Sequence, residues 1–194
     1  MSKAVSISDA VTVLSKGGVV GLPTETVYGL AASLKSEEGI REVFRIKERP
    51  FFDPLIVHCA SLEQVQSVVS IWTPAHQLLA QRFWPGPLTM IVPKKSVVSD
   101  LVTSGLPSVG VRIPSHPVAL SVIQQLGCPV AAPSANKFGK TSPTTARHVR
   151  DEFGPSVVVL EGGPCDVGIE STVIEIVEDN TGLRILILRP GMIQ

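Results

Sequence analysis

The chain has 194 residues, and its 17 basic and 17 acidic side chains give a formal net charge of zero. This balance argues against a strongly basic nucleic-acid-binding protein and against a protein with an acidic tail. Hydrophobic residues make up 44% of the chain, enough for a sizeable core, while no apolar run reaches the roughly 18 residues that a membrane span requires.

Apolar, β-branched runs alternate with helical patterns along the chain. Strands are expected, in chain order, at residues 19–24, 54–60, 88–94, 108–114, 129–135, 156–162, 171–177 and 183–189. Helices are expected after Ser36, at the Ser61–Gln64 capping box, at Thr73-Pro74, from Pro117 to Gly127, and from Thr144 or Thr145 to Val149. This alternation predicts an α/β domain. The last two strands are joined through residues 179–182 and predict an antiparallel hairpin, so the sheet is expected to be mixed.

Polar side chains stand at the ends of several of these strands, where ligands bind in open α/β sheets. Thr26 follows the first strand, His58 ends the second, and Ser134 and Asn136 follow the run at 129–135. Taken one by one, such residues are more often turn formers, helix caps or structural histidines. Arg112, inside an apolar strand, fits an internal salt bridge and an anionic ligand equally well. The repeated placement at strand ends favours a binding site.

The charges are unevenly distributed. Residues 64–150 contain one acidic residue, Asp100, against eight basic ones, which indicates an anionic ligand. The helix after Ser36 ends in Arg45, Lys47 and Arg49, which suits either a solvated basic helix end or a clamp on phosphates. A P-loop is excluded, because Ser134 stands where that motif requires its first glycine.

The three cysteines form no CxxC pair, and the four histidines lack the spacing of metal ligands. Neither a disulfide framework nor a cysteine zinc site is therefore indicated, and we expect a protein of the reducing cytoplasm with no membrane contact.

Nine separated motifs occur in the order of one known family. They are LPTETVYGLAA (22–32), IKERP (46–50), PLIVH (54–58), FWPGPLT (83–89), VGVRIPSHP (109–117), APSAN (132–136), SPTTA (142–146), GIESTVI (168–174) and ILRPG (187–191). The chain thus resembles the YrdC-like threonylcarbamoyl-AMP synthases, also called TsaC. The resemblance implies a twisted mixed sheet flanked by helices around a positively charged concave cavity. It also implies the short form of the family, with a single domain spanning residues 1–194.

The resemblance further implies a nucleotidyltransferase that makes L-threonylcarbamoyladenylate and pyrophosphate from L-threonine, bicarbonate and ATP. A separate transferase complex then passes the threonylcarbamoyl group to an adenosine in certain tRNAs. Mg²⁺ is expected on the triphosphate, held mainly by phosphate oxygens and water. No protein metal site is expected.

The family's functional positions map onto eleven residues here. The resemblance gives Lys47 and Arg49 a catalytic role on the ATP phosphates. It implies that the remaining nucleotide-binding residues are Ser134, Asn136, Ser142 and Arg189. It implies that the threonine pocket consists of Thr26, His58, Arg112, Ala132 and Ser171. Arg112 is the candidate for the threonine carboxylate, because a guanidinium matches it bidentately.

One segment departs from the family. Between the Lys-x-Arg-Pro motif and Pro54, the family commonly places basic or amide residues, whereas this chain has Phe51, Phe52 and Asp53. A carboxylate at position 53 repels a triphosphate unless it faces Mg²⁺ or Arg49. Three rival interpretations stay open: an RNA-binding module, a carbamoyl-transfer relative of the hydrogenase maturation proteins, and an inactive paralogue. Only 5% aromatic residues and the lack of an RNA-binding signature count against the first, and missing zinc-finger-like motifs against the second.

Overall fold

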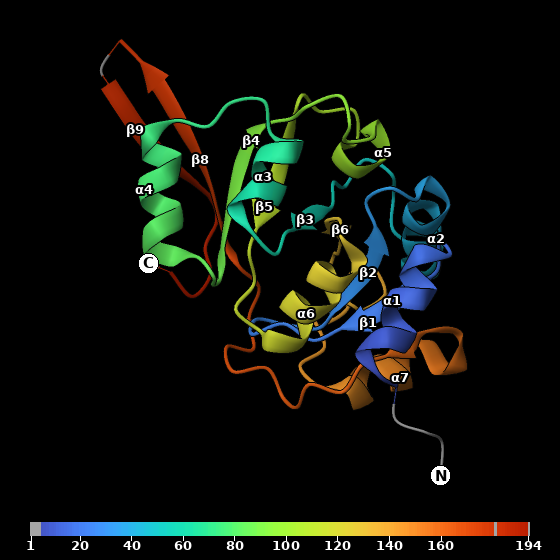
Figure 1. The fold of residues 1–194 in the computed structure, drawn as a ribbon. Coiled ribbons are helices and arrows are strands. Elements are labelled where there is room, and N and C mark those ends of the chain that lie inside the picture. The colour runs from blue at the N-terminus through green and yellow to red at the C-terminus, as the bar shows by residue number, and fades with distance from the viewer. Residues whose placement is uncertain (1–4, 181, 194) are drawn as a thin grey trace.

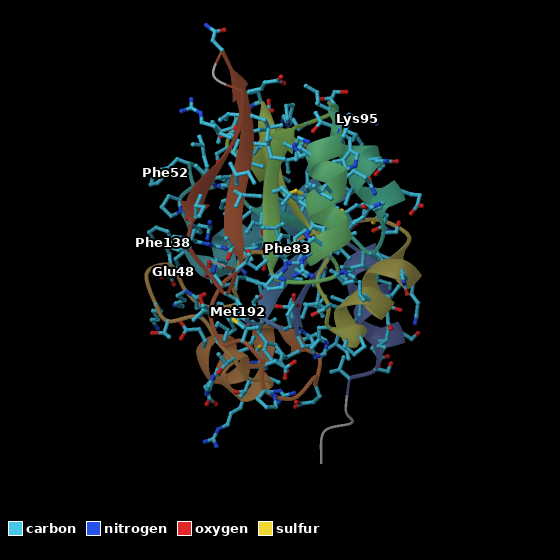
Figure 2. All side chains as sticks on the ribbon, turned by 90° about the vertical axis from the view of Figure 1, so that its left-hand side faces the viewer. Glu48, Phe52, Phe83, Lys95, Phe138 and Met192 are labelled. Carbon is cyan, nitrogen blue, oxygen red and sulfur yellow. The ribbon has the colours of Figure 1, made fainter. Side chains whose placement is uncertain are left out.

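A computed structural model of the chain describes residues 5–180 and 182–193, and the strands of this part form one sheet (Figure 1). The strands are β1 (Val19–Leu22), β2 (Gly29–Ser33), β3 (Ile56–His58), β4 (Leu88–Pro93), β5 (Ser108–Arg112), β6 (Val130–Ala131), β7 (Val158–Val159), β8 (Thr172–Asp179) and β9 (Gly182–Arg189). Their order across the sheet is β7-β1-β2-β6-β3-β5-β4-β8-β9. The pairs β1/β7, β3/β5 and β4/β8 are parallel and the other neighbours are antiparallel, so the prediction of a mixed sheet is confirmed.

Helices flank this sheet. They are α1 (Ile7–Ser15), α2 (Glu37–Lys47), α3 (Leu62–Val68), α4 (Pro74–Phe83), α5 (Asp100–Thr103), α6 (Pro117–Leu126), α7 (Ala146–Phe153) and the 3-10 turn η1 (Gly154–Ser156). The predicted helix starts are confirmed, since the side chains of Ser36, Ser61 and Thr73 each accept a hydrogen bond from the backbone three residues on. Thr145, rather than Thr144, caps α7, which runs on past Val149.

Four elements were not predicted from the sequence: α1, β2, α5 and the 3-10 turn η1. Strand β2 is built from glycine, alanine, serine and one leucine, residue types that give little strand signal, yet all five of its residues are buried. Helix α1 begins with a reciprocal capping box between Ser6 and Asp9. The expected strands at 129–135 and 156–162 shrink to two paired residues each.

The two faces of the sheet are covered unequally. On the β1–β2–β6 side, α1 and α6 pack against one face and α2 against the other. On the β3–β5–β4–β8 side, alternate residues such as Val57, Met90 and Val111 point into the core that contains residues of α3 and α4. The residues between them on the same strands face the opposite way, where a cavity remains. The site therefore follows from the alternation of strand side chains.

Strands β8 and β9 form the predicted hairpin, which projects from the body of the protein (Figure 1). Thr181, in the predicted turn, lies outside the described residues. The register shifts once: Ile174 pairs with Ile187, but Val173 pairs with Arg189, so Leu188 is the extra residue of a β-bulge. Apolar side chains of β9 are exposed, from Leu183 to Leu188. Among the described residues, no helix is long and apolar enough to cross a membrane.

Candidate functional site

The uncovered face of the sheet holds a cavity of about 220 Å³, which we call the sheet cavity. In the parallel pair β3/β5, His58 lies opposite Arg112, and both side chains line this space. Gly110 also lies on this face of the sheet. A Cβ at this position would lie only 3.3 Å from the side chains of Thr89 and Ile91, so a larger residue would crowd this side of the cavity. The sequence placed the site beyond the strand ends. His58 and Arg112 do end their strands, while the cavity also extends across the sheet face and loops close its sides.

All five residues expected to bind threonine line the sheet cavity. They are Thr26, His58, Arg112, Ala132 and Ser171. Thr26 enters from the loop after β1, Ala132 from the end of β6, and Ser171 from the residue before β8. The structure thus brings together residues that are up to 145 positions apart in the chain.

Arg112 is buried and firmly held. Its Nη2 lies 2.6 Å from Oε1 of Glu25, its Nη1 donates to Thr26 Oγ1 at 2.9 Å, and its Nε donates to the Gly86 carbonyl at 3.1 Å. Burial lowers the pKa of Arg112, and the charge of Glu25 opposes that shift. The internal salt bridge considered from the sequence is therefore present. A guanidinium has five N–H donors, of which these contacts use three.

His58 is neutral in this environment. Complete burial, with the Arg112 charge nearby, lowers its pKa to about 3. Its Nδ1 donates to the Ile56 carbonyl at 3.3 Å, which leaves Nε2 as an acceptor. His58 therefore offers the cavity a hydrogen-bond acceptor without a positive charge, and it is too weak a base to accept a proton at neutral pH.

A second cavity of about 270 Å³, the loop cavity, adjoins the first. The two share five lining residues: Arg49, Asp53, Ser134, Glu170 and Arg189. Lys47, Asn136 and Ser142 line the loop cavity alone. All six residues expected to bind ATP therefore border this second space, and three of them border both.

Lys47 ends α2 and is almost completely buried. Its Nζ donates to the carbonyls of Ser134 and Asn136, each at 2.5 Å. Burial, assisted by the charge of Arg49, lowers the pKa of Lys47 to about 8. The ammonium group therefore both ties α2 to the 134–136 loop and places a cation at the wall of the loop cavity.

Arg49 follows the end of α2. Glu48 has a left-handed backbone (φ 54°) that stops the helix. The guanidinium of Arg49 donates to the carbonyls of Asp53 and Pro54, both at 3.1 Å, and lies 2.8 Å from the Asp53 carboxylate. Burial lowers the pKa of Arg49. The sequence left two possible partners for the Asp53 carboxylate, Mg²⁺ and Arg49. In the structure this carboxylate faces Arg49.

Polar contacts hold the remaining wall of the loop cavity. Asn136 Nδ2 donates to the carbonyls of Lys137 and Lys140, at 2.8 and 2.7 Å, so this side chain shapes its own loop. Glu170 accepts from Ser142 Oγ at 2.9 Å and forms an ion pair with Arg189. Burial alone would raise the pKa of Glu170, but the charge of Arg189 and the bond from Ser142 hold it below its usual value.

Arg189 also connects the two cavities. Its Nε and Nη2 donate to the Ser171 carbonyl at 3.1 and 3.0 Å, and Nη2 donates to Ser171 Oγ at 3.0 Å. Ser171 Oγ in turn lies 2.7 Å from Thr89 Oγ1. The hydroxyl expected to contact one substrate is therefore bonded to the arginine expected to contact the other.

Sequence reasoning considered Asp53 as a partner of Arg49 but missed the other two acidic partners, Glu25 and Glu170. Each of the three cavity arginines is paired with a carboxylate: Arg49 with Asp53, Arg112 with Glu25, and Arg189 with Glu170. Glu25 and Glu170 stand inside the motifs LPTETVYGLAA and GIESTVI, beside Thr26 and Ser171. The need of a buried arginine for a counter-charge could have drawn attention to them.

A family profile for the Sua5, YciO and YrdC proteins, described as "Telomere recombination", matches residues 12–191. The chain belongs to this family. The match covers both cavities and confirms the resemblance drawn from the nine motifs. Members of this Sua5/YciO/YrdC family with known structures also share the architecture: Escherichia coli YciO superimposes with a TM-score of 0.82 at 23% identity, covering 96% of this chain and 89% of that one.

The chain is similar to proteins named threonylcarbamoyl-AMP synthase. That of Pyrococcus abyssi is 44% identical over 179 residues, which are 92% of this chain and 52% of the relative. That of Psychromonas ingrahamii is 30% identical over 185 residues, 94% of this chain and 97% of the relative. The crystal structure of P. abyssi Sua5 complexed with L-threonine has a TM-score of 0.90 at 40% identity, covering 97% and 56%. The chain spans about half the length of the curated relatives that it matches at 39% identity or more.

Proposed function

We propose that the protein is an L-threonylcarbamoyladenylate synthase, a nucleotidyltransferase that uses L-threonine, bicarbonate and ATP. The observation that supports this most directly is the pair of adjoining cavities, which share Arg49, Ser134 and Arg189. The sheet cavity is lined by buried hydrogen-bonding groups around Arg112, and the loop cavity is bordered by Lys47, Arg49 and Arg189. Such an arrangement suits an amino acid placed next to a triphosphate. The names of the relatives agree with it.

In the sheet cavity, the guanidinium of Arg112 binds the threonine carboxylate, whose charge and planar geometry it matches. Thr26, Ser171 and the backbone at Ala132 surround the side chain and the amino group. His58, being neutral, accepts a hydrogen bond and does not repel the amine. The pocket is therefore selective for a small hydroxylated amino acid, because buried polar groups penalise a ligand that leaves them unpaired.

In the loop cavity, Lys47, Arg49 and Arg189 attract the phosphates, and Ser134, Asn136 and Ser142 fix the nucleotide. The amine of threonine combines with bicarbonate to give a carbamate and water. A carbamate oxygen then bonds to the α-phosphorus while the bond to pyrophosphate breaks. This transfer depends on positioning and on stabilising the charge of the leaving pyrophosphate, so it needs no nucleophilic side chain of the protein.

Mg²⁺ is part of the ATP substrate in this scheme. Among the residues that the structure describes, no group of three or more His, Cys, Asp or Glu side chains could hold a metal ion. This donor set fits a cation bound by phosphate oxygens and water, with at most a carboxylate contact from the protein. We further propose that residues 1–194 act as one unit with a net positive field in the cavities, and that the adenylate passes to a tRNA-modifying transferase.

The test is pyrophosphate release measured with each substrate omitted in turn. We expect release only when L-threonine, bicarbonate and ATP are all present. Release that is indifferent to threonine would contradict the proposal. The rival RNA-binding function predicts tight tRNA binding without turnover, which a filter-binding assay on the same preparation detects. The variant Arg147→Ala, which loses only an exposed ion pair with Asp151, serves as the active control.

A further inference from the structure

The carboxylate of Asp53 lies at the place where the two cavities meet. It lines both of them, and its side chain is about one third exposed. Its Oδ2 lies 2.8 Å from Nη2 of Arg49, a cation assigned above to the phosphates. The Asp53 carboxylate is therefore paired with the same Arg49 guanidinium that is proposed to bind the phosphates of ATP.

The backbone holds Arg49 independently of that carboxylate. Its Nε donates to the Asp53 carbonyl and its Nη2 donates to the Pro54 carbonyl, both at 3.1 Å. These two bonds already aim the guanidinium at the 53–54 turn. The charge on Asp53 is thus not needed to orient Arg49, so its effect is chiefly electrostatic.

Glu170 differs from Asp53 in this respect. It pairs with Arg189 and also accepts a hydrogen bond from Ser142. Removing its charge would disturb several contacts of the cavity wall. Asp53 can instead turn towards solvent when its partner is taken, because it is partly exposed and stands in a loop between α2 and β3.

We propose that Asp53 is a specificity-determining residue that makes this site discriminate against the metal-free triphosphate. An incoming triphosphate displaces the Asp53 carboxylate from Arg49 and then lies a few ångströms from it. Like charges at that distance repel, and the repulsion grows with the net negative charge of the ligand. A triphosphate that carries a divalent cation has two fewer negative charges and is repelled less. This inference deepens the proposed function and rests on its assignment of the loop cavity to ATP.

The experiment measures equilibrium binding of ATP by isothermal titration calorimetry, without threonine so that no turnover occurs. It compares ATP in excess EDTA with ATP in excess Mg²⁺, for the full chain and for Asp53→Asn. The amide keeps the shape of the side chain and removes its charge. We expect the variant to bind metal-free ATP about tenfold more tightly and Mg·ATP only about threefold more tightly. The preference of the protein for Mg·ATP therefore falls about threefold.

The chain offers a matched control in Asp151→Asn. Asp151 pairs with Arg147 four residues away, the same spacing as Arg49 and Asp53, on an exposed surface outside both cavities. This variant should leave both affinities unchanged. Equal affinities in Asp53→Asn and the unaltered chain would overturn the inference, as would a selective loss of Mg·ATP binding, which would mark Asp53 as a cation ligand. If the unaltered chain binds no ATP in either condition, the proposed function itself fails.

Discussion

The sheet cavity and the loop cavity hold their charged groups in different ways. In the sheet cavity, His58 and Arg112 project from paired strands and are buried, and the carboxylate of Glu25 behind Arg112 is buried as well. In the loop cavity, Arg49 and Arg189 stand at the ends of elements, with partners that are about one third exposed. The first arrangement is fixed by strand register. The second includes ion pairs that can exchange, beside the buried Lys47.

This difference suits ligands of different kinds. A small amino acid must be distinguished from other amino acids of similar size and polarity, which requires a rigid pocket with few water molecules. A triphosphate is recognised by charge, and it must leave as pyrophosphate after the reaction. Partly exposed ion pairs contribute little individually, so their exchange costs little. Buried pairs are costly to break. Variants that affect one cavity and leave the other unchanged test this division.

Arg112→Ala should have the largest effect, and only on the sheet cavity. We expect the dissociation constant for threonine to rise by about 100-fold, since a buried charge-assisted contact is lost. ATP binding should stay the same. The free energy of unfolding should fall by about 3–5 kcal/mol, because Glu25 is left as an unpaired buried charge. Calorimetry with threonine and urea unfolding measure the two effects.

The double variant Arg112→Ala/Glu25→Gln separates binding from folding. It removes the stranded charge, so the free energy of unfolding should recover in part while threonine affinity stays low. Threonine affinity that survives Arg112→Ala would show that the carboxylate site lies elsewhere. Equal losses for threonine and ATP would break the division between the cavities.

Lys47 should make ATP binding depend on pH. Its pKa is lowered to about 8, so its charge is lost, and ATP affinity falls, as the pH rises through 8. Lys47→Met should lower ATP affinity about tenfold at pH 7, the loss of one close charge pair, and should remove this pH dependence. Lys95→Met is the matched control, because Lys95 also donates to a backbone carbonyl, that of Gln66, but outside both cavities.

Unfolding does not explain a loss of affinity above pH 8. Between pH 8 and the ordinary lysine value of 10.5, the unfolded chain binds the proton of Lys47 and the folded chain does not. Lys47 therefore increases the free energy of unfolding as the pH rises through this window, because burying its charged form is unfavourable. A pH titration of ATP binding alongside urea unfolding distinguishes the two. Unchanged ATP affinity from pH 7 to 9.5 would refute the role of Lys47.

Ser142→Ala should have the smallest effect. It removes one hydrogen bond to Glu170, worth about 0.5–1.5 kcal/mol, so ATP affinity should change by roughly two- to tenfold and threonine affinity should not change. Ser99→Ala breaks a similar serine–glutamate bond, to Glu37 on the surface, and should leave ATP affinity unchanged. A larger effect on threonine affinity than on ATP affinity would contradict the assignment of Ser142 to the loop cavity.

Much of the fold could be predicted because its signals are local. Ser36, Ser61 and Thr73 cap helices through contacts three residues away, and these contacts follow from the sequence alone. Strand β2 could not be found in this way. Its small residues have no strand preference. It pairs locally with β1, but its other partner, β6, lies more than 90 residues further along the chain.

The eleven expected site residues border the two cavities, but their internal partners could not be deduced. Nothing in the sequence says that Lys47 bonds to carbonyls at positions 134 and 136, or that Arg112 pairs with Glu25, because these contacts depend on the tertiary fold. The strand-end rule also located the site only approximately. His58 and Arg112 do end their strands, yet the cavity extends over the sheet face to Ile91.

The β-bulge at Leu188 determines that Arg189, at the end of the terminal hairpin, points into the cavity. Residues that pair across strands point to the same face, and Arg189 faces the cavity with Val173 because Leu188 adds one residue to the strand. In an unbroken register, Leu188 would stand opposite Val173, and the guanidinium would point to the other side of the sheet. The length of this strand is thus as much a part of the site as any side chain. Between homologous chains, one residue gained or lost here would matter more than most substitutions, although the number of arginines would stay the same.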